Sequence, residues 1–91
     1  MPLTPDVARD LASLEALMRD LSDSPGNANA LMHEHLESAR FYLTGAMPDE
    51  FRFSLGLAAK HLSQIEDSGL RSRIAEFLRL HQAHPDQTPE G

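Results

Sequence analysis

The fold is decided most clearly by one stretch, residues 48–65, which reads PDEFRFSLGLAAKHLSQI. Its apolar residues recur at steps of four and three, the spacing that places side chains on one stripe of an α-helix. The stripe consists of Phe51, Leu55, Ala58, Leu62 and Ile65. A proline followed by two acids is typical of a helix start, because proline fits the first helical position and carboxylates favour the positive end of the helix dipole. We therefore expect an amphipathic helix over residues 48–66.

A turn follows this stretch at residues 67–69, and after it the sequence predicts a shorter helix over residues 69–83 that ends near His81. The apolar stripe of this helix consists of Leu70, Ile74, Phe77 and Leu78. The tail at residues 85–91 contains two prolines and no large apolar residue, so we expect it to be disordered. Residues 1–84 would then form one helical domain.

Two further helices are predicted on the N-terminal side, over residues 28–45 and 5–22. Turn-forming residues at 22–27 separate them, and residues 45–48 (GAMP) end the second. Thr4 is expected to cap the first helix, and Asn27 or Asn29 the second. The two stripes consist of Val7, Leu11, Leu14, Met18 and Leu21, and of Met32, Leu36, Ala39 and Leu43.

Four amphipathic helices with short connections predict an all-α protein, a compact four-helix bundle. An up-and-down arrangement of antiparallel neighbours buries the four stripes most simply. An irregular orthogonal packing is the alternative.

Composition narrows the class of function. The chain of 91 residues has no cysteine, which excludes disulfides and sulfur-ligated zinc sites. It has no leader-like or membrane-spanning apolar run, so we expect a cytoplasmic protein without a membrane partner. A net charge of -6 disfavours nucleic-acid binding. Two alternatives stay open: an acidic surface for a basic partner, and a helix-turn-helix whose last helix carries Arg71, Arg73 and Arg79.

Catalytic motifs are not found in the sequence. It contains neither a nucleophile elbow nor a glycine-rich phosphate loop after a strand. Its carboxylates fall mainly on predicted polar faces, where charge normally serves solvation. We expect no enzymatic activity and no cofactor.

Histidines support a metal-binding or small-ligand alternative. His33 and Glu37 are four residues apart and would share one helix face, but the second imidazole of the zinc-protease motif is missing. His61 could converge on them from another helix. His81 and His84 are three apart at the end of the last helix, where histidine is also favoured by the dipole. A solvated or structural role is the simpler interpretation of these residues.

More apolar residues are present than four stripes require. Those off the main registers are Leu17, Leu31, Phe41, Phe53, Leu57 and Leu80. They could fill a compact core, or they could form a second apolar face that another protein covers. We favour the second interpretation, a non-enzymatic interaction module that acts as a homodimer or as an adaptor for an amphipathic helix of another protein. The predicted contact residues are Phe41, Tyr42, Met47, Phe53 and Leu57.

Overall fold

The computed structural model describes residues 4–24 and 26–87, with side chains as far as His81. The described part of the chain contains no strand and four α-helices: α1 (Pro5–Asp23), α2 (Asn27–Thr44), α3 (Pro48–Lys60) and α4 (Ser68–Gln87). A short 3-10 turn, η1 (Leu62–Gln64), joins α3 to α4. The predicted all-α four-helix bundle is confirmed. Among these residues, no helix combines the length and the apolar content that crossing a bilayer requires.

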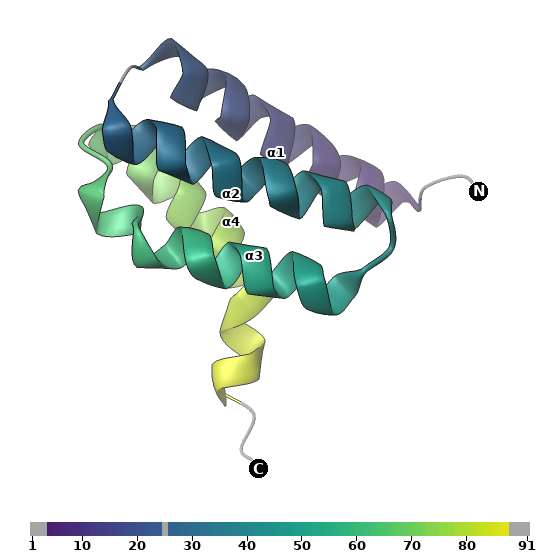
Figure 1. The fold of residues 1–91 in the computed structure, drawn as a ribbon. Coiled ribbons are helices and arrows are strands. Elements are labelled where there is room, and N and C mark those ends of the chain that lie inside the picture. Colours follow the sequence, from purple (N-terminus) through teal and green to yellow (C-terminus); the bar gives the residue numbers. More distant parts are fainter. Residues whose placement is uncertain (1–3, 25, 88–91) are drawn as a thin grey trace.

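The first three helices follow one another in alternating directions (Figure 1). α1, α2 and α3 run side by side, whereas α4 crosses behind α2 and α3 and continues past them toward the C-terminus. α4 packs on both α3 and α1, which closes the bundle. The outer surface of α2 and α3 is the face turned away from α4.

All four helices contribute to one core, and the predicted stripes supply most of it. The buried apolar side chains are Leu14, Leu17, Met18, Leu21, Met32, Leu36, Ala39, Phe51, Leu55, Ala58, Ile65, Leu70, Ile74, Phe77 and Leu78. Leu17 lies off the predicted stripe and is nevertheless buried, because α1 packs against both α2 and α4 and needs a wider apolar face. Val7 and Leu11, which were expected on the stripe, are only half-buried near the start of α1.

The helix starts follow the sequence at α1 but not at α2. The Thr4 side-chain oxygen accepts a hydrogen bond of 3.1 Å from the Val7 amide, as an N-cap does. The expected asparagine cap of α2 is wrong, since Gly26 occupies the N-cap and no side chain caps it. Gly26 has φ of 152°, a conformation that favours glycine. Asn29 instead donates its side-chain N–H to the Ser24 carbonyl and so closes the turn.

The predicted end of the third helix at residue 66 is wrong. α3 ends at Lys60, the 3-10 turn follows, and Ile65 adopts an extended conformation while its side chain stays fully buried. The Arg71 guanidinium donates a 2.7 Å hydrogen bond to the Ile65 carbonyl, a partner that replaces the one a continued helix would supply. Periodicity identified the buried side chain correctly and could not distinguish helix from turn at this position.

The C-terminal boundary also differs from its prediction. α4 runs to Gln87, four residues beyond the predicted end at 83. The Asp67 carboxylate accepts from the Leu70 amide at the start of this helix. Residues 85–87, which were expected in the disordered tail, belong to α4. Residues 88–91 lie outside the described part of the chain, and their disorder stays a prediction.

The turn between α2 and α3 is a Schellman motif with an unusual residue in it. The Met47 amide donates to the Tyr42 carbonyl at 2.9 Å and the Ala46 amide to the Leu43 carbonyl at 3.3 Å. Ala46 has φ of 58°, in the left-handed region where this motif normally has glycine. The glycine of this sequence, Gly45, precedes that position by one residue and has φ of -88°.

Replacing Ala46 by glycine should therefore stabilise the fold. A left-handed non-glycine residue costs roughly 1–2 kcal/mol, and the extra freedom of glycine in the unfolded chain offsets part of this, so Ala46→Gly should raise the free energy of unfolding by about 0.5–1 kcal/mol. Urea denaturation measures the change. Ala46→Val is the opposing control and should lower stability, because a β-branched residue fits this region poorly. A loss of stability in Ala46→Gly would contradict the assignment.

Candidate functional site

Two phenylalanines are the most exposed large apolar residues of the described chain. Phe41 on α2 exposes 67% of its surface and Phe53 on α3 exposes 68%. We call their surroundings the aromatic face, the outer surface of α2 and α3 that carries Leu31, Phe41, Tyr42, Met47, Phe53 and Leu57. In Figure 1 this pair of helices forms the layer in front of α4.

Helix rotation explains why both rings point outward. Phe41 comes two residues after buried Ala39, and Phe53 comes two residues after buried Phe51. Two residues turn an α-helix by about 200°, so a side chain two positions from the buried stripe points to the opposite side. Neither ring can enter the core without exposing that stripe.

The two exposed rings also lie at nearly the same level along the helices. His35 of α2 and His61, the residue directly after α3, stack with ring centroids 5.4 Å apart, which sets the approximate register of these antiparallel helices. Phe41 lies six residues after His35, and Phe53 lies eight residues before His61. Because the helices are antiparallel, both steps lead in the same direction. Phe41 and Phe53 therefore differ in level by two residues, which is a rise of about 3 Å along the helix. Because the axes of packed helices lie 8–10 Å apart, the Cα atoms of these two phenylalanines are on the order of 10 Å apart. The two rings are therefore close enough for one partner chain to cover both.

The remaining predicted contact residues form the base and edge of the aromatic face. Tyr42 and Leu57 are half-buried, and Tyr42 packs against the core. The Tyr42 ring meets that of Phe41 edge-on, with centroids 5.5 Å apart and an interplanar angle of 71°. Met47 exposes 37% of its surface at the turn. Of the extra apolar residues, Leu17 does fill the core, whereas Phe41 and Phe53 do not.

Charged residues lie at one end of the aromatic face. Glu34, Glu37 and Ser38 line a hollow of about 390 Å³ together with Phe41 and Tyr42. On α3, Lys60 is exposed, and Arg52 pairs with Asp49 at 2.7 Å near the opposite end. Sequence reasoning missed Glu34 and Lys60 as site residues, because their place beside the rings depends on the register of two helices.

The proposed metal donors do not gather in one place. His33 lines a hollow beside the turn between α1 and α2, whereas Glu37 lines the hollow beside Phe41. It is His35 that contacts His61. Within residues 4–24 and 26–81, no group of three histidine, aspartate or glutamate side chains is placed to hold an ion. The His84 side chain lies outside the described residues.

The stacked histidines include a buried polar atom without a hydrogen-bond partner in the described part of the chain. The Nδ1 atom of His61 is buried and lacks a hydrogen-bond partner among the described residues. Burial, and then the neighbouring His61 ring, lowers the pKa of His35 from its ordinary value of 6.5, and the Glu34 carboxylate acts in the opposite direction. This pair therefore favours uncharged imidazole at His35.

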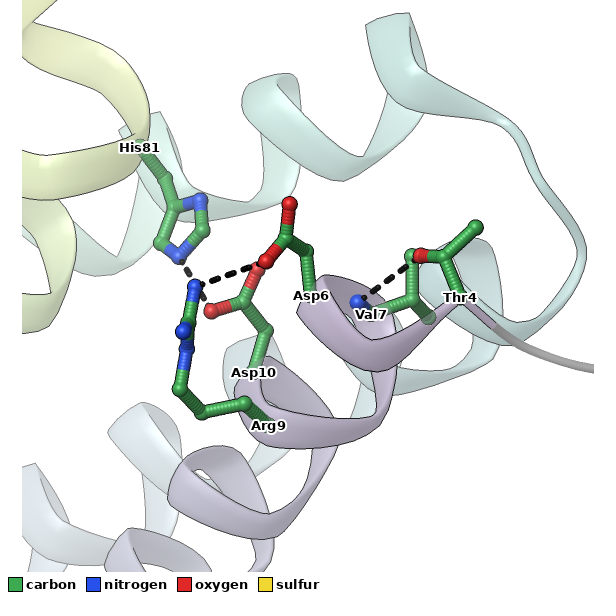
Figure 2. A network of polar contacts seen from close by, with 6 residues as sticks. All are labelled: Thr4, Asp6, Val7, Arg9, Asp10 and His81. Carbon is green, nitrogen blue, oxygen red and sulfur yellow. Dashed lines mark hydrogen bonds and ion pairs between the residues drawn. The ribbon is translucent and has the colours of Figure 1, made fainter.

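His81 ties three helices together. Its Nε2 atom lies 3.3 Å from an Asp10 oxygen on α1, and Figure 2 shows the two side chains pointing at each other. Its ring meets Phe51 of α3 and Phe77 of α4, with centroids 5.5 and 4.6 Å away. Next to it, Arg9 pairs with Asp6 on the outside of α1 (Figure 2). These contacts make His81 a structural residue.

The three arginines of α4 contact groups within the chain, and a helix-turn-helix would have to exchange these contacts for phosphates. Arg71 donates to the Ile65 carbonyl, Arg73 to Asp20 and Arg79 to Glu76. The hydrogen bond from Arg79 lowers the pKa of Glu76 and raises that of Arg79. A recognition helix needs such side chains free for phosphates and base edges.

A second apolar surface lies between α1 and α4. It is an open groove of about 440 Å³ whose apolar lining includes Leu17, Phe77 and Leu80, and Leu80 is 55% exposed. Because this groove depends on the angle at which α4 crosses α1, the sequence could not indicate it.

Searches of known protein families, of curated proteins and of solved structures found no match to this chain. The features of this chain that bear on function are two exposed rings on one face and the charges beside them.

The histidine stack gives a testable dependence on pH. Unfolded His35 takes up a proton near pH 6.5, whereas folded His35 does so only at lower pH, so the unfolded state binds more protons in this interval. The contribution of uncharged His35 to the free energy of unfolding is complete above pH 6.5. It is lost as the pH falls through the lowered pKa of folded His35. Urea unfolding of the natural protein and of His35→Gln at several pH values measures this. The natural protein should lose stability relative to the variant on acidification; a constant difference would contradict the argument.

Proposed function

We propose that this chain is a non-enzymatic protein-interaction module, and that its mechanism is burial of the aromatic face of α2 and α3 against another protein chain. The proposal includes a cytoplasmic location. One observation carries it. Phe41 and Phe53 each leave about two thirds of their surface in water on the same side of the bundle.

The size of this surface is suited to reversible binding. Aromatic side chains bury 150–250 Å² each, so the exposed parts of two rings offer roughly 250 Å². At about 25 cal/mol per Å², burial contributes about 6 kcal/mol for each aromatic face. Association costs an estimated 4–15 kcal/mol in lost freedom, so the rings need the flanking contacts of Leu31 and Met47 to bind measurably.

Two kinds of chain suit such a surface. A second copy would cover one aromatic face with another, and an amphipathic helix of another protein would place its apolar stripe over the rings. In either case the phenylalanines serve as anchors and the surrounding polar residues form the rim.

The test combines light scattering with a peptide probe. Molar mass is measured over a concentration series, and a fluorescent 18-residue peptide with an amphipathic leucine stripe is titrated into the same samples. We expect a mass above the 10.1 kDa of one chain, or binding of the peptide, and loss of whichever is seen in Phe53→Asp. A protein that stays monomeric and does not bind the peptide would overturn the proposal.

A matched control separates the two apolar surfaces. Leu80→Asp places the same charge on an exposed apolar residue of the groove between α1 and α4 and should leave association intact. At a protein concentration where every sample is monomeric, both variants should unfold like the natural protein, within about 0.5 kcal/mol, because the replaced side chains are exposed. If Leu80→Asp abolishes association and Phe53→Asp does not, the groove is the binding surface.

A further inference from the structure

The aromatic face carries features that match a second copy of itself. It has one ring and an acidic pair on α2, namely Phe41, Glu34 and Glu37, and one ring and a base on α3, namely Phe53 and Lys60. Resting on the function proposed above, we infer that the partner is a second copy of this chain, bound with α2 of each protomer over α3 of the other.

The register of the two helices leads to this arrangement. With His35 and His61 at one level, Lys60 lies at the level of residue 36, between Glu34 and Glu37. Phe53 lies within two residues of the level of Phe41. Along α2 and α3, a ring therefore lies at nearly the same height as a ring, and the acidic pair of α2 lies at the height of the base of α3.

A two-fold axis parallel to the helices brings these matching residues of the two copies into contact. The axis runs in the plane of contact, between α2 and α3, and rotation about it exchanges the positions of the two helices without changing height. Phe41 then faces Phe53 of the second copy, and the Glu34 and Glu37 pair faces its Lys60. Both pairings occur twice because an isologous interface repeats each contact.

Charge placement is favourable in this geometry despite the net charge of -6. The acids of α2, Glu34 and Glu37, lie opposite a base. The acids of α3, Asp49 and Glu50, lie near the turn, at heights where the facing helix has no carboxylate, and Asp49 already pairs with Arg52. Lys60 has no ion-pair partner among the described residues of its own chain and is exposed to solvent.

Charge exchange tests the pairing. Dissociation constants of the homodimer are measured by analytical ultracentrifugation for the natural protein, Glu37→Lys, Lys60→Glu and the double variant. Each single variant places like charges opposite each other and should weaken the dimer about tenfold, which is 1.4 kcal/mol. The double variant should recover to within about threefold of the natural protein, because it restores opposite charges across the interface.

The outcomes separate this inference from the proposed function. If the dimer is lost in Phe53→Asp but is insensitive to all three charge variants, the aromatic face is the interface and the pairing of α2 with α3 is wrong. If the natural protein is monomeric and binds the peptide probe, the partner is another protein and the second copy is wrong. At a protein concentration where every sample is monomeric, urea unfolding of the charge variants should match the natural protein, which shows that weaker dimerisation is not due to a damaged fold.

Discussion

Burial of one apolar stripe from each helix is the constraint on which the rest of the structure depends. Six large side chains from all four helices and from the segment before α4 are wholly excluded from water: Leu14, Met32, Leu36, Leu55, Ile65 and Ile74. A chain of 91 residues can build only one such core, so each helix must turn its stripe inward and no helix can be rotated independently. The orientation of every outward residue follows from this requirement.

The aromatic face is a direct consequence of that orientation. Once Ala39 and Phe51 are buried, Phe41 and Phe53 must point away from the core, and the register shown by the His35 and His61 stack brings them to one level. The same register places Lys60 beside the acidic residues of α2. The surface that we propose to bind another chain therefore requires no special loop, since two regular helices and one Schellman turn determine it.

Patterns within a single helix were predictable from the sequence, and relations between helices were not. The periodic stripes located the core, and the Thr4 cap was found because its partner is three residues away. The end of α3 was misplaced because Ile65 keeps the helical spacing although its carbonyl is bound by Arg71, six residues later in the chain. The contact of His61 with His35, and not with His33, was also not predictable, because the rotation of α2 relative to α3 determines which histidine meets His61. The exposure of the phenylalanines was predicted from their spacing, and the charges beside them were not.

The connectivity of the bundle has a consequence for how the chain folds. Consecutive helices pack on each other, so most of the interface area forms between segments that are close in sequence, which favours rapid folding. The contact of α4 with α1 is different, because the Arg73 and Asp20 pair joins residues 53 positions apart and the His81 and Asp10 contact joins residues still farther apart. Closing that loop costs the most chain entropy. The α2–α3 hairpin, and the aromatic face with it, can therefore assemble before the two ends of the chain meet.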